Sequence, residues 1–173
     1  PVEQEQLSEE EWNVVKKVIS EAVDMLLQFR TQEGLALQHK FGEKIENIGK
    51  LLGEVEPYEK SRVEKIRARI KDGLAELKDV EINEGRLEQE MIYYIEKLDV
   101  NEEKQRLANH LKYFRETMDG TPGQGKKLGF ISQEMGREIN TLGSKSNLAE
   151  MQNIVVKMKD ELEQIKEQVL NAL

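Results

Sequence analysis

The chain has 173 residues and a formal net charge of −8, and 35% of its residues are charged while 5% are aromatic. This length fits one domain or one elongated helical module, and the low aromatic content excludes a thick compact core. Cysteine is absent, which excludes disulfides, thiolate catalysis and cysteine-ligated metals and agrees with a reducing cytoplasm. No signal peptide opens the sequence and no run approaches the ~20 apolar residues of a membrane span. We therefore expect a soluble cytoplasmic protein that does not bind membranes.

The first part of the chain has the pattern of a long helix. Ser8 and Glu11 have the spacing of a capping box, and apolar residues then recur at alternating steps of three and four: Trp12, Val15, Ile19, Ala22, Leu26 and Phe29. This heptad seam loses phase near residues 31–34. It resumes through Phe41, Ile45, Ile48, Leu52 and Val55, which predicts one helix with a stutter.

A turn at Pro57 is predicted to end this long helix. Residues 58–77 give a second helix, with Ile66, Ile70 and Leu74 on one face. Because the connection is short, we expect the second helix to return antiparallel to the first. Residues 8–77 are thus predicted to form a long antiparallel helical hairpin.

The rest of the chain, residues 86–173, predicts a smaller helical cluster. After a loop at 78–85, a helix over 86–98 would turn Leu87, Met91, Tyr94 and Ile95 inward. Asp99 and Glu102 then have capping-box spacing, and the following helix would bury Leu107, Leu111, Phe114 and Met118. A glycine-rich turn at 120–125 follows. The last helix repeats the three-and-four alternation at Leu148, Met151, Val155, Met158, Leu162, Ile165 and Val169. The expected fold is a single all-α module with coiled-coil-like seams.

The helix expected after the glycine-rich turn carries a dense polar set. If Ile131, Met135, Ile139 and Leu142 face the core, then Gln133, Glu134, Arg137 and Glu138 form a neighbouring stripe, because residues three and four apart stand side by side. The turn before it matches the G-x-x-x-x-G-K spacing of a phosphate loop. However, Lys127 replaces the hydroxyl residue, Pro122 removes a backbone donor and no strand precedes the loop, so we predict no nucleotide cofactor. Lys126 and Lys127 at a helix start would instead attract an RNA phosphate.

A second group of polar residues falls on the preceding helix. Glu103, Arg106 and His110 are three and four residues apart and share one helical face. Two interpretations stay open here. The three side chains point into one cleft, or Glu103 and Arg106 form an ordinary surface pair while His110 packs at the edge of the core.

Residues 125–146 closely resemble the C-terminal signature of the YicC-like family of bacterial endoribonucleases. Further matches follow in the family's order at residues 25–37, 86–90, 99–103, 106–110 and 167–171. Two departures stand out. Gly129 occupies a position where the family usually has Asp, and Ala172-Leu173 replaces the usual Ile-Glu.

The resemblance implies that the chain is the C-terminal part of a longer protein, without the family's N-terminal domain. That protein would be a cytoplasmic endoribonuclease that cleaves RNA phosphodiester bonds with a divalent cation, Mn²⁺ or Mg²⁺, and assembles as a hexameric ring. An alternative from another class is a non-catalytic helical module of a stress-associated YicC-like protein, which assembles the ring or positions RNA while the chemistry lies in the absent domain. A generic coiled-coil scaffold would explain the seams but not the polar signature.

The resemblance and the residue chemistry together give the candidate site residues. Catalytic roles are assigned to Glu103, His110, Glu134 and Glu138, with His110 in proton transfer and Glu134 and Glu138 as metal ligands or water activators. RNA or phosphate binding is assigned to Arg106, Lys126, Lys127, Gln133, Arg137, Ser144 and Lys145. Glu90 and Glu103 are further candidate ligands. The competing interpretation is a satisfied polar network that holds the last two helices together, and the net charge of −8 argues against broad RNA binding.

Overall fold

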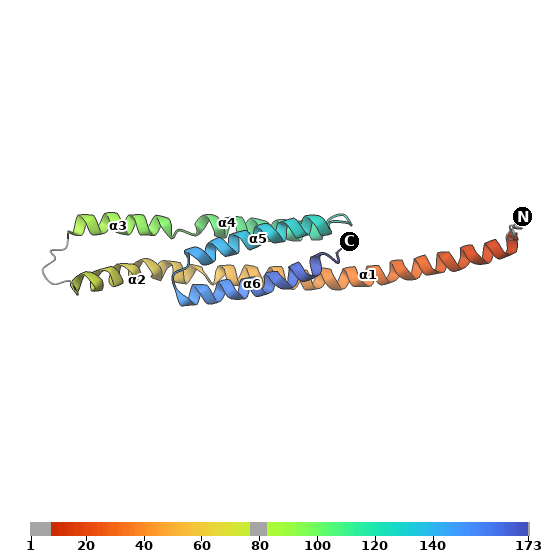
Figure 1. Cartoon of the computed structure of the whole chain (residues 1–173), viewed down its shortest axis with the longest axis horizontal. Coiled ribbons are helices and arrows are strands. Elements are labelled where there is room, and N and C mark those ends of the chain that lie inside the picture. The colour runs from red at the N-terminus through yellow and green to blue at the C-terminus, as the bar shows by residue number, and fades with distance from the viewer. Residues whose placement is uncertain (1–7, 77–82, 173) are drawn as a thin grey trace, which may run out of the picture. The chain divides into compact units, whose positions relative to one another are not determined.

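The computed structural model describes residues 8–76 and 83–172, and the regular structure in these residues is entirely α-helical. The described part contains six helices, which Figure 1 labels in chain order: α1 (Glu9–Gly53), α2 (Glu56–Ala75), α3 (Glu84–Lys97), α4 (Asn101–Met118), α5 (Gly125–Lys145) and α6 (Ala149–Val169). The all-α prediction is confirmed. None of the helices in these ranges is long and apolar enough to cross a membrane.

The chain divides into two compact units, residues 1–39 and residues 40–173. In the first unit, the described residues belong to α1 apart from its cap at Ser8. The predicted capping box is present, because the Ser8 backbone N–H donates to Glu11 Oε2 at 2.9 Å and the Glu11 N–H donates to Ser8 Oγ at 3.3 Å. α1 runs unbroken through residues 31–34, as the stutter predicted. Every residue from 8 to 36 is exposed to solvent.

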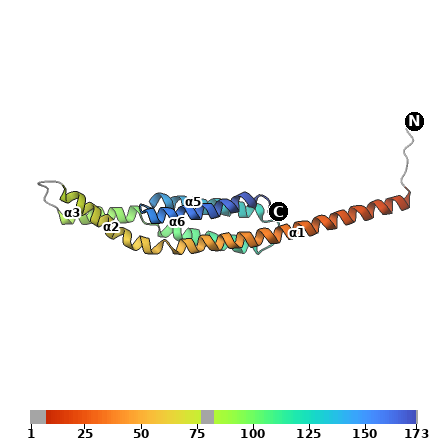
Figure 2. The same cartoon turned by 90° about the horizontal axis from the view of Figure 1, so that it is seen from below.

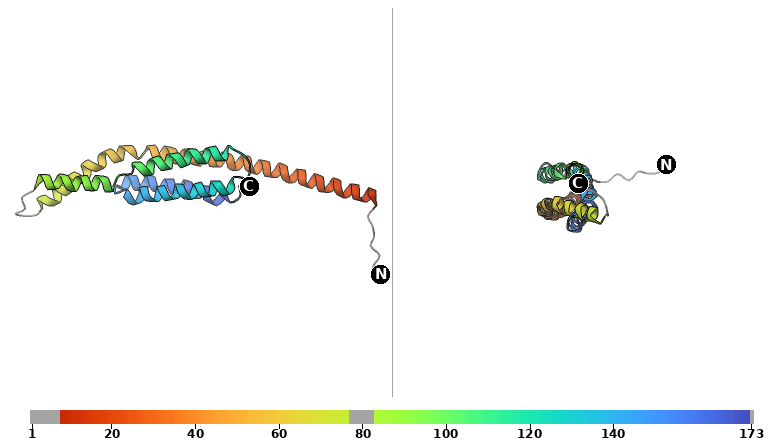
Figure 3. Two further views of the ribbon diagram at one scale, coloured as in Figure 1. Left: turned by 90° about the horizontal axis from the view of Figure 1, so that it is seen from above. Right: turned by 90° about the vertical axis from the view of Figure 1, so that its left-hand side faces the viewer.

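A four-helix bundle forms the centre of the second unit. It consists of residues 40–53 of α1 together with α4, α5 and α6, and each helix is antiparallel to its neighbours (Figures 2 and 3). Phe41 of α1 packs edge to face on Phe114 of α4, with ring centroids 5.9 Å apart. One turn further along α1, Lys44 Nζ lies 3.2 Å from Glu161 Oε2 of α6. The bundle thus closes around one apolar core.

The core of the bundle follows the predicted seams. The four apolar residues predicted to face inward from α5 are all buried, as are six of the seven on α6: Met151, Val155, Met158, Leu162, Ile165 and Val169. Helices α5 and α6 approach closely at Gly143, where an added Cβ would lie 2.9 Å from Val155 Cγ1. The α6 seam therefore has its partner within the chain.

The turn predicted at Pro57 is wrong. α1 ends at Gly53, and Pro57 lies in the first turn of α2, where its missing N–H costs no helical hydrogen bond. Val55 between the two helices keeps helical dihedrals (φ −71°, ψ −36°), so α2 continues the direction of α1 after a bend (Figure 2). The antiparallel partner of α2 is α3, joined to it by the Arg67 guanidinium, whose Nη2 donates to Glu88 Oε2 at 3.1 Å. A long antiparallel hairpin exists, but α3 and α4 form its returning arm.

Smaller predictions in the middle of the chain also need correction. Tyr94 and Ile95 were expected inward, yet each is 40% exposed, and only Leu87 and Met91 of α3 are buried. Asp99 does not cap α4, because the cap position is Val100 and the Asp99 carboxylate accepts instead from the Asn101 side chain at 2.7 Å.

The boundaries of two predicted segments also shift. Of the loop predicted over 78–85, residues 78–82 lie outside the described residues, and so does Leu77 at the end of the predicted second helix. The remaining loop positions contribute the cap and first turn of α3, which begins at Glu84.

Candidate functional site

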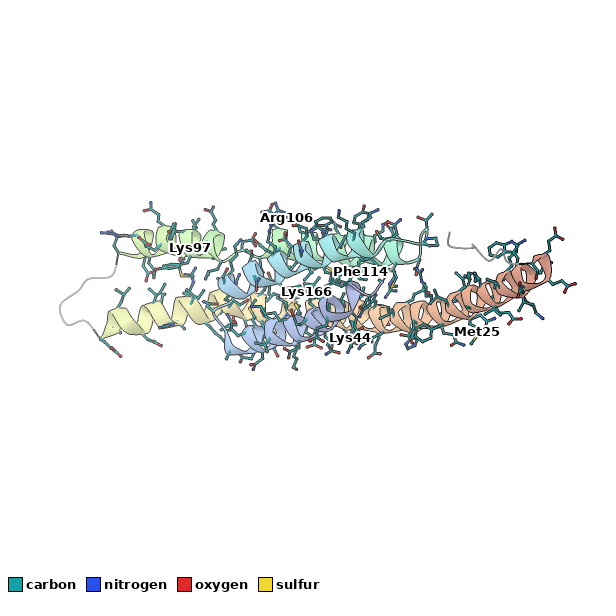
Figure 4. All side chains as sticks on the ribbon, turned by 45° about the vertical axis from the view of Figure 1, so that its right-hand side comes forward. Met25, Lys44, Lys97, Arg106, Phe114 and Lys166 are labelled. Carbon is teal, nitrogen blue, oxygen red and sulfur yellow. The ribbon has the colours of Figure 1, made fainter. Side chains whose placement is uncertain are left out.

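Some of the polar residues singled out by the sequence, among them Glu103, Arg106, Glu138 and Lys145, lie along the contact between α4 and α5. The two helices are antiparallel, and their apolar faces meet through buried residues that include Leu107, Phe114, Leu128 and Met135. Figure 4 labels Arg106 and Phe114 on α4, with Arg106 at its outer edge and Phe114 toward the packed helices. Polar side chains thus border an otherwise apolar helix contact, and we call this border the α4–α5 edge.

A buried carboxylate stands at one end of the α4–α5 edge. Glu103 has 8% of its side chain exposed, and its Oε1 accepts a hydrogen bond at 2.8 Å from Nζ of Lys145, the last residue of α5. Burial raises the pKa of Glu103, but the Lys145 hydrogen bond and the charges of Lys145 and Arg106 outweigh it, so the pKa lies below its ordinary value. Glu103 Oε2 is buried and accepts no hydrogen bond from the described residues. Glu103 is therefore held as a carboxylate at neutral pH.

One turn further along α4, Arg106 bridges two carboxylates. Its Nη1 lies 3.8 Å from Oε1 of Glu138, which has 7% of its side chain exposed, and its Nη2 donates to the exposed Glu102. The Arg106 side chain itself is 56% exposed. The guanidinium group therefore lies near a buried carboxylate while it remains open to solvent.

The other signature residues of α5 lie toward solvent. Arg137 Nη1 donates to Glu134 Oε2 at 3.1 Å within the same helix, and Gln133 is exposed. The hydroxyl of exposed Ser144 donates to the carbonyl of Thr141 at 2.9 Å, which caps the helix rather than reaching another element. The structure thus brings Glu138 and Lys145 to α4, but not Gln133, Glu134, Arg137 or Ser144.

At the opposite end of the α4–α5 edge, two lysines open α5 beside an aromatic ring. Lys126 and Lys127 are exposed, and Lys127 Nζ lies 4.7 Å from the centroid of the half-exposed Tyr113 ring on α4. His110 is half-buried on α4. It lies seven residues from Glu103, about 10 Å along the helix axis, so the structure does not bring these two side chains into one cleft.

Sequence reasoning missed a cation that supports this site from α2. Arg62 is 5% exposed, and its Nη1 donates to the Lys145 carbonyl at 3.4 Å. Burial lowers its pKa, against the opposing charges of Glu59 and Asp99. A signal was present, because Arg62 precedes Ile66 by four residues and so falls on the apolar face of its helix. Glu59 beside it also accepts a hydrogen bond from Lys104 of α4.

Within residues 8–76 and 83–172, the acidic side chains of one chain do not assemble into a metal-ligand set. No group of three or more His, Cys, Asp or Glu side chains with metal-binding geometry occurs in the described ranges. Glu134 and Glu138 are one turn apart, and each carboxylate is paired with an arginine. These residues alone therefore do not fit a resident divalent cation, and metal dependence stays a prediction.

Comparison with known proteins decides the family. The family model described as "Endoribonuclease YicC-like, C-terminal" matches residues 55–172, which include the whole α4–α5 edge. The chain belongs to the YicC-like endoribonuclease family. A protein of Clostridioides difficile named "Probable endoribonuclease YicC" is 34% identical over 162 residues, covering 92% of this chain and 55% of that protein. A protein of Haemophilus influenzae with the same name is 33% identical over 153 residues, covering 86% of this chain and 52% of its own length.

The chain spans about half the length of the curated relatives it matches. The resemblance found in the sequence is thereby confirmed at the level of the family and of its C-terminal region.

Proposed function

We propose that the chain is the RNA-contacting C-terminal part of an endoribonuclease that cleaves RNA phosphodiester bonds. Family membership supports the activity. The role of this region in contacting RNA rests on the surroundings of Arg106. Charged side chains commonly flank an apolar helix contact, so position alone assigns no role to Arg106. Its distinguishing feature is that its Nη1 lies 3.8 Å from the buried Glu138 carboxylate while 56% of its side chain remains open to solvent.

The geometry of Arg106 suits a phosphate group. A guanidinium presents several N–H donors in a planar fork that matches phosphate oxygens. The pair with Glu102 is exposed, 65% on the Glu102 side, and exposed pairs contribute little stability. An RNA phosphate can therefore displace Glu102 while Glu138 keeps the guanidinium in place. Lys126 and Lys127 at the start of α5 offer a second contact for the RNA backbone.

The remaining parts of the catalytic hypothesis rest on the resemblance. They are a divalent cation, Mn²⁺ or Mg²⁺, proton transfer by His110, a hexameric ring and a cytoplasmic location. The described residues of one chain hold no group of three or more His, Cys, Asp or Glu side chains that could bind such a cation.

A second candidate function is RNA positioning without catalytic groups in this chain. One observation favours it. Several cations predicted to bind RNA already have a carboxylate partner, including Arg106, Arg137 and Lys145. In that case the chemistry would lie in the part of the relatives that this chain does not cover.

The test combines RNA cleavage with RNA binding. A structured RNA is incubated with this chain and with the complete gene product that contains it, with Mn²⁺ or Mg²⁺ and again with a chelator. Cleavage by the chain alone that the chelator abolishes would place a metal-dependent site in these residues. Cleavage by the complete product alone would favour the positioning role, and cleavage by neither would contradict the proposed activity.

Arg106 variants test the site itself. Arg106→Ala removes a charge-assisted contact and is expected to weaken RNA binding about tenfold. Arg106→Lys keeps the charge but loses the planar fork of N–H donors, so its RNA affinity is expected to lie between those of the wild type and Arg106→Ala. Arg67→Ala is the matched control, because Arg67 also pairs with a Glu across two helices and is 40% exposed, but lies on α2. Equal RNA affinity of Arg106→Ala and the wild type would refute the role of Arg106.

A further inference from the structure

Two exposed aromatic side chains, one on α4 and one on α5, lie near the lysines that begin α5. Tyr113 of α4 is 44% exposed, and Phe130 of α5 is 57% exposed. A single exposed aromatic residue is common on protein surfaces and needs no explanation. These two rings differ from that case, because they come from two packed helices and stand beside the same cation.

Lys127 connects the two rings. Its Nζ lies 4.7 Å from the centroid of the Tyr113 ring, and Phe130 follows it by three residues on α5. Phe130 also follows the exposed Lys126 by four residues. Residues three and four apart stand side by side on a helix surface. Tyr113, Lys126, Lys127 and Phe130 therefore form one continuous exposed surface, which we call the aromatic–lysine patch.

The two lysines of the patch are available to an anion without an exchange of partners. Within residues 8–76 and 83–172, neither Lys126 nor Lys127 has a carboxylate at ion-pair distance. Arg106, Arg137 and Lys145, in contrast, are each paired with a glutamate. A phosphate can therefore reach Lys126 or Lys127 without displacing a carboxylate, although the chain as a whole carries a net charge of −8.

The patch continues the surface that carries Arg106. Arg106, His110 and Tyr113 follow one another on α4 at steps of four and three residues, so they share one helix face. Arg106 and Tyr113 are seven residues apart, about 10 Å along the helix axis. An RNA strand with a phosphate on Arg106 can therefore continue along α4 to the patch.

We propose that the aromatic–lysine patch binds unpaired RNA, with bases stacked on Tyr113 and Phe130 and the adjoining phosphates on Lys126 and Lys127. Unpaired bases expose faces that stack on aromatic side chains, whereas the bases of a double helix are stacked on one another. The lysines favour a polyanion over an apolar protein surface, because such a surface would desolvate two charges. This binding mode rests on the RNA-contacting function proposed above, and it adds the class of RNA.

Two tyrosines provide a matched test of the patch. Tyr93 on α3 is 55% exposed and also has a lysine beside its ring, with Lys97 Nζ 5.7 Å from the centroid, but it lies outside the patch. Binding is measured by fluorescence anisotropy with a short labelled RNA that lacks secondary structure, and with the same strand annealed to its complement. Tyr113→Leu and Phe130→Leu are each expected to weaken binding of the single strand about fivefold, while Tyr93→Leu binds like the wild type. Equal single-strand affinity of Tyr113→Leu, Phe130→Leu and the wild type would overturn the proposal, and so would an equal loss for the duplex.

Further measurements separate base stacking from phosphate contact. An abasic strand keeps the phosphates but lacks the bases, so it is expected to bind Phe130→Leu and the wild type equally well. Phe130→Leu is expected to leave the salt dependence of binding unchanged, because no charge is lost, and Phe130→Trp, which keeps an aromatic face, is expected to retain the affinity.

The outcomes also distinguish this proposal from the proposed function. Weaker binding by Arg106→Ala, together with wild-type affinity of both patch leucine variants, would leave the RNA-contacting function standing and overturn stacking on the patch. Absence of RNA binding by the wild-type chain would overturn both. If Phe130→Leu left RNA affinity unchanged but altered the mass of the complete gene product, the patch would be a protein contact and the proposal would be wrong.

Discussion

The pair of Glu103 and Lys145 offers the clearest physical test of the α4–α5 edge. Lys145→Met keeps most of the apolar stem of the side chain but removes the ammonium group. Glu103, with 8% of its side chain exposed, is then left with a charge and without the hydrogen bond that Lys145 Nζ donates at 2.8 Å. The substitution therefore isolates a buried carboxylate without opening a large cavity.

The size of the effect follows from the burial of the two partners. Breaking a fully buried ion pair by removing one partner costs about 3–5 kcal/mol. Lys145 is 30% exposed, so water reaches the pair from one side and lowers that figure. We expect Lys145→Met to reduce the free energy of unfolding by about 2 kcal/mol at pH 7, with Glu103→Gln/Lys145→Met losing less than the sum of the single variants.

The loss should depend on pH in a defined direction. The folded-state pKa of Glu103 is lowered, so its contribution to stability is present above the unfolded-state pKa and is lost as pH falls through the folded value. The wild type and Lys145→Met should therefore differ most near pH 7 and converge as the medium becomes acidic enough to protonate Glu103.

The measurement is urea unfolding followed by circular dichroism at pH 7 and in acid, with Lys60→Met as control. Lys60 pairs with Glu56 on the surface of α2, where it is 77% exposed, and its loss should leave the unfolding midpoint unchanged. A Lys145→Met protein as stable as the wild type at pH 7, or one with the same deficit at both pH values, would refute the account of Glu103 as a buried charge held by Lys145.

Two further predictions concern α5 and RNA. Gly129→Ala is expected to stabilise the chain by up to about 1 kcal/mol, because alanine favours the helix and the added Cβ lies 4.0 Å from Val169 Cγ1, which is an ordinary contact. Gly143→Ala is expected to destabilise the chain, because its Cβ would lie 2.9 Å from Val155 Cγ1. Thermal unfolding of both variants checks this order, and equal unfolding midpoints would contradict it. RNA affinity should fall as the salt concentration rises. The slope of log affinity against log salt concentration should decrease in magnitude by about one in Arg106→Ala, because one phosphate contact is lost. An unchanged slope in titrations at several salt concentrations would exclude a phosphate contact by Arg106.

Much of the fold could be predicted because helix faces follow local periodicity. The α5 and α6 seams needed only the spacing of residues such as Met135 and Met158, both fully buried. The direction of α2 could not be predicted in this way. Pro57 suits the first turn of a helix as well as a turn after one, and only the helical dihedrals of Val55 make α2 continue from α1. Tyr94 and Ile95 were misplaced because periodicity does not show how wide a face the neighbouring helix covers.

The site was only partly predictable, because its pairs cross from one helix to another. Glu103 with Lys145, Arg106 with Glu138 and Tyr113 with Lys127 are all brought together by the antiparallel packing of α4 against α5. The sequence supplied most of these residues but not the register. The charges do form ion pairs between helices, but these pairs join α5 to α4 rather than to the last helix.

The two cations Arg106 and Lys145 are not equivalent for binding RNA. If a phosphate took Lys145, the buried Glu103 carboxylate would lose its partner, and a buried charge without a partner is strongly unfavourable. If a phosphate took Arg106, the carboxylate released would be that of Glu102, which is 65% exposed and returns to water at little cost. A phosphate that reaches Arg106 or Lys145 therefore has to displace a carboxylate partner. We therefore infer that Arg106 contacts the phosphate, while Lys145 stays paired with Glu103 and joins α5 to α4.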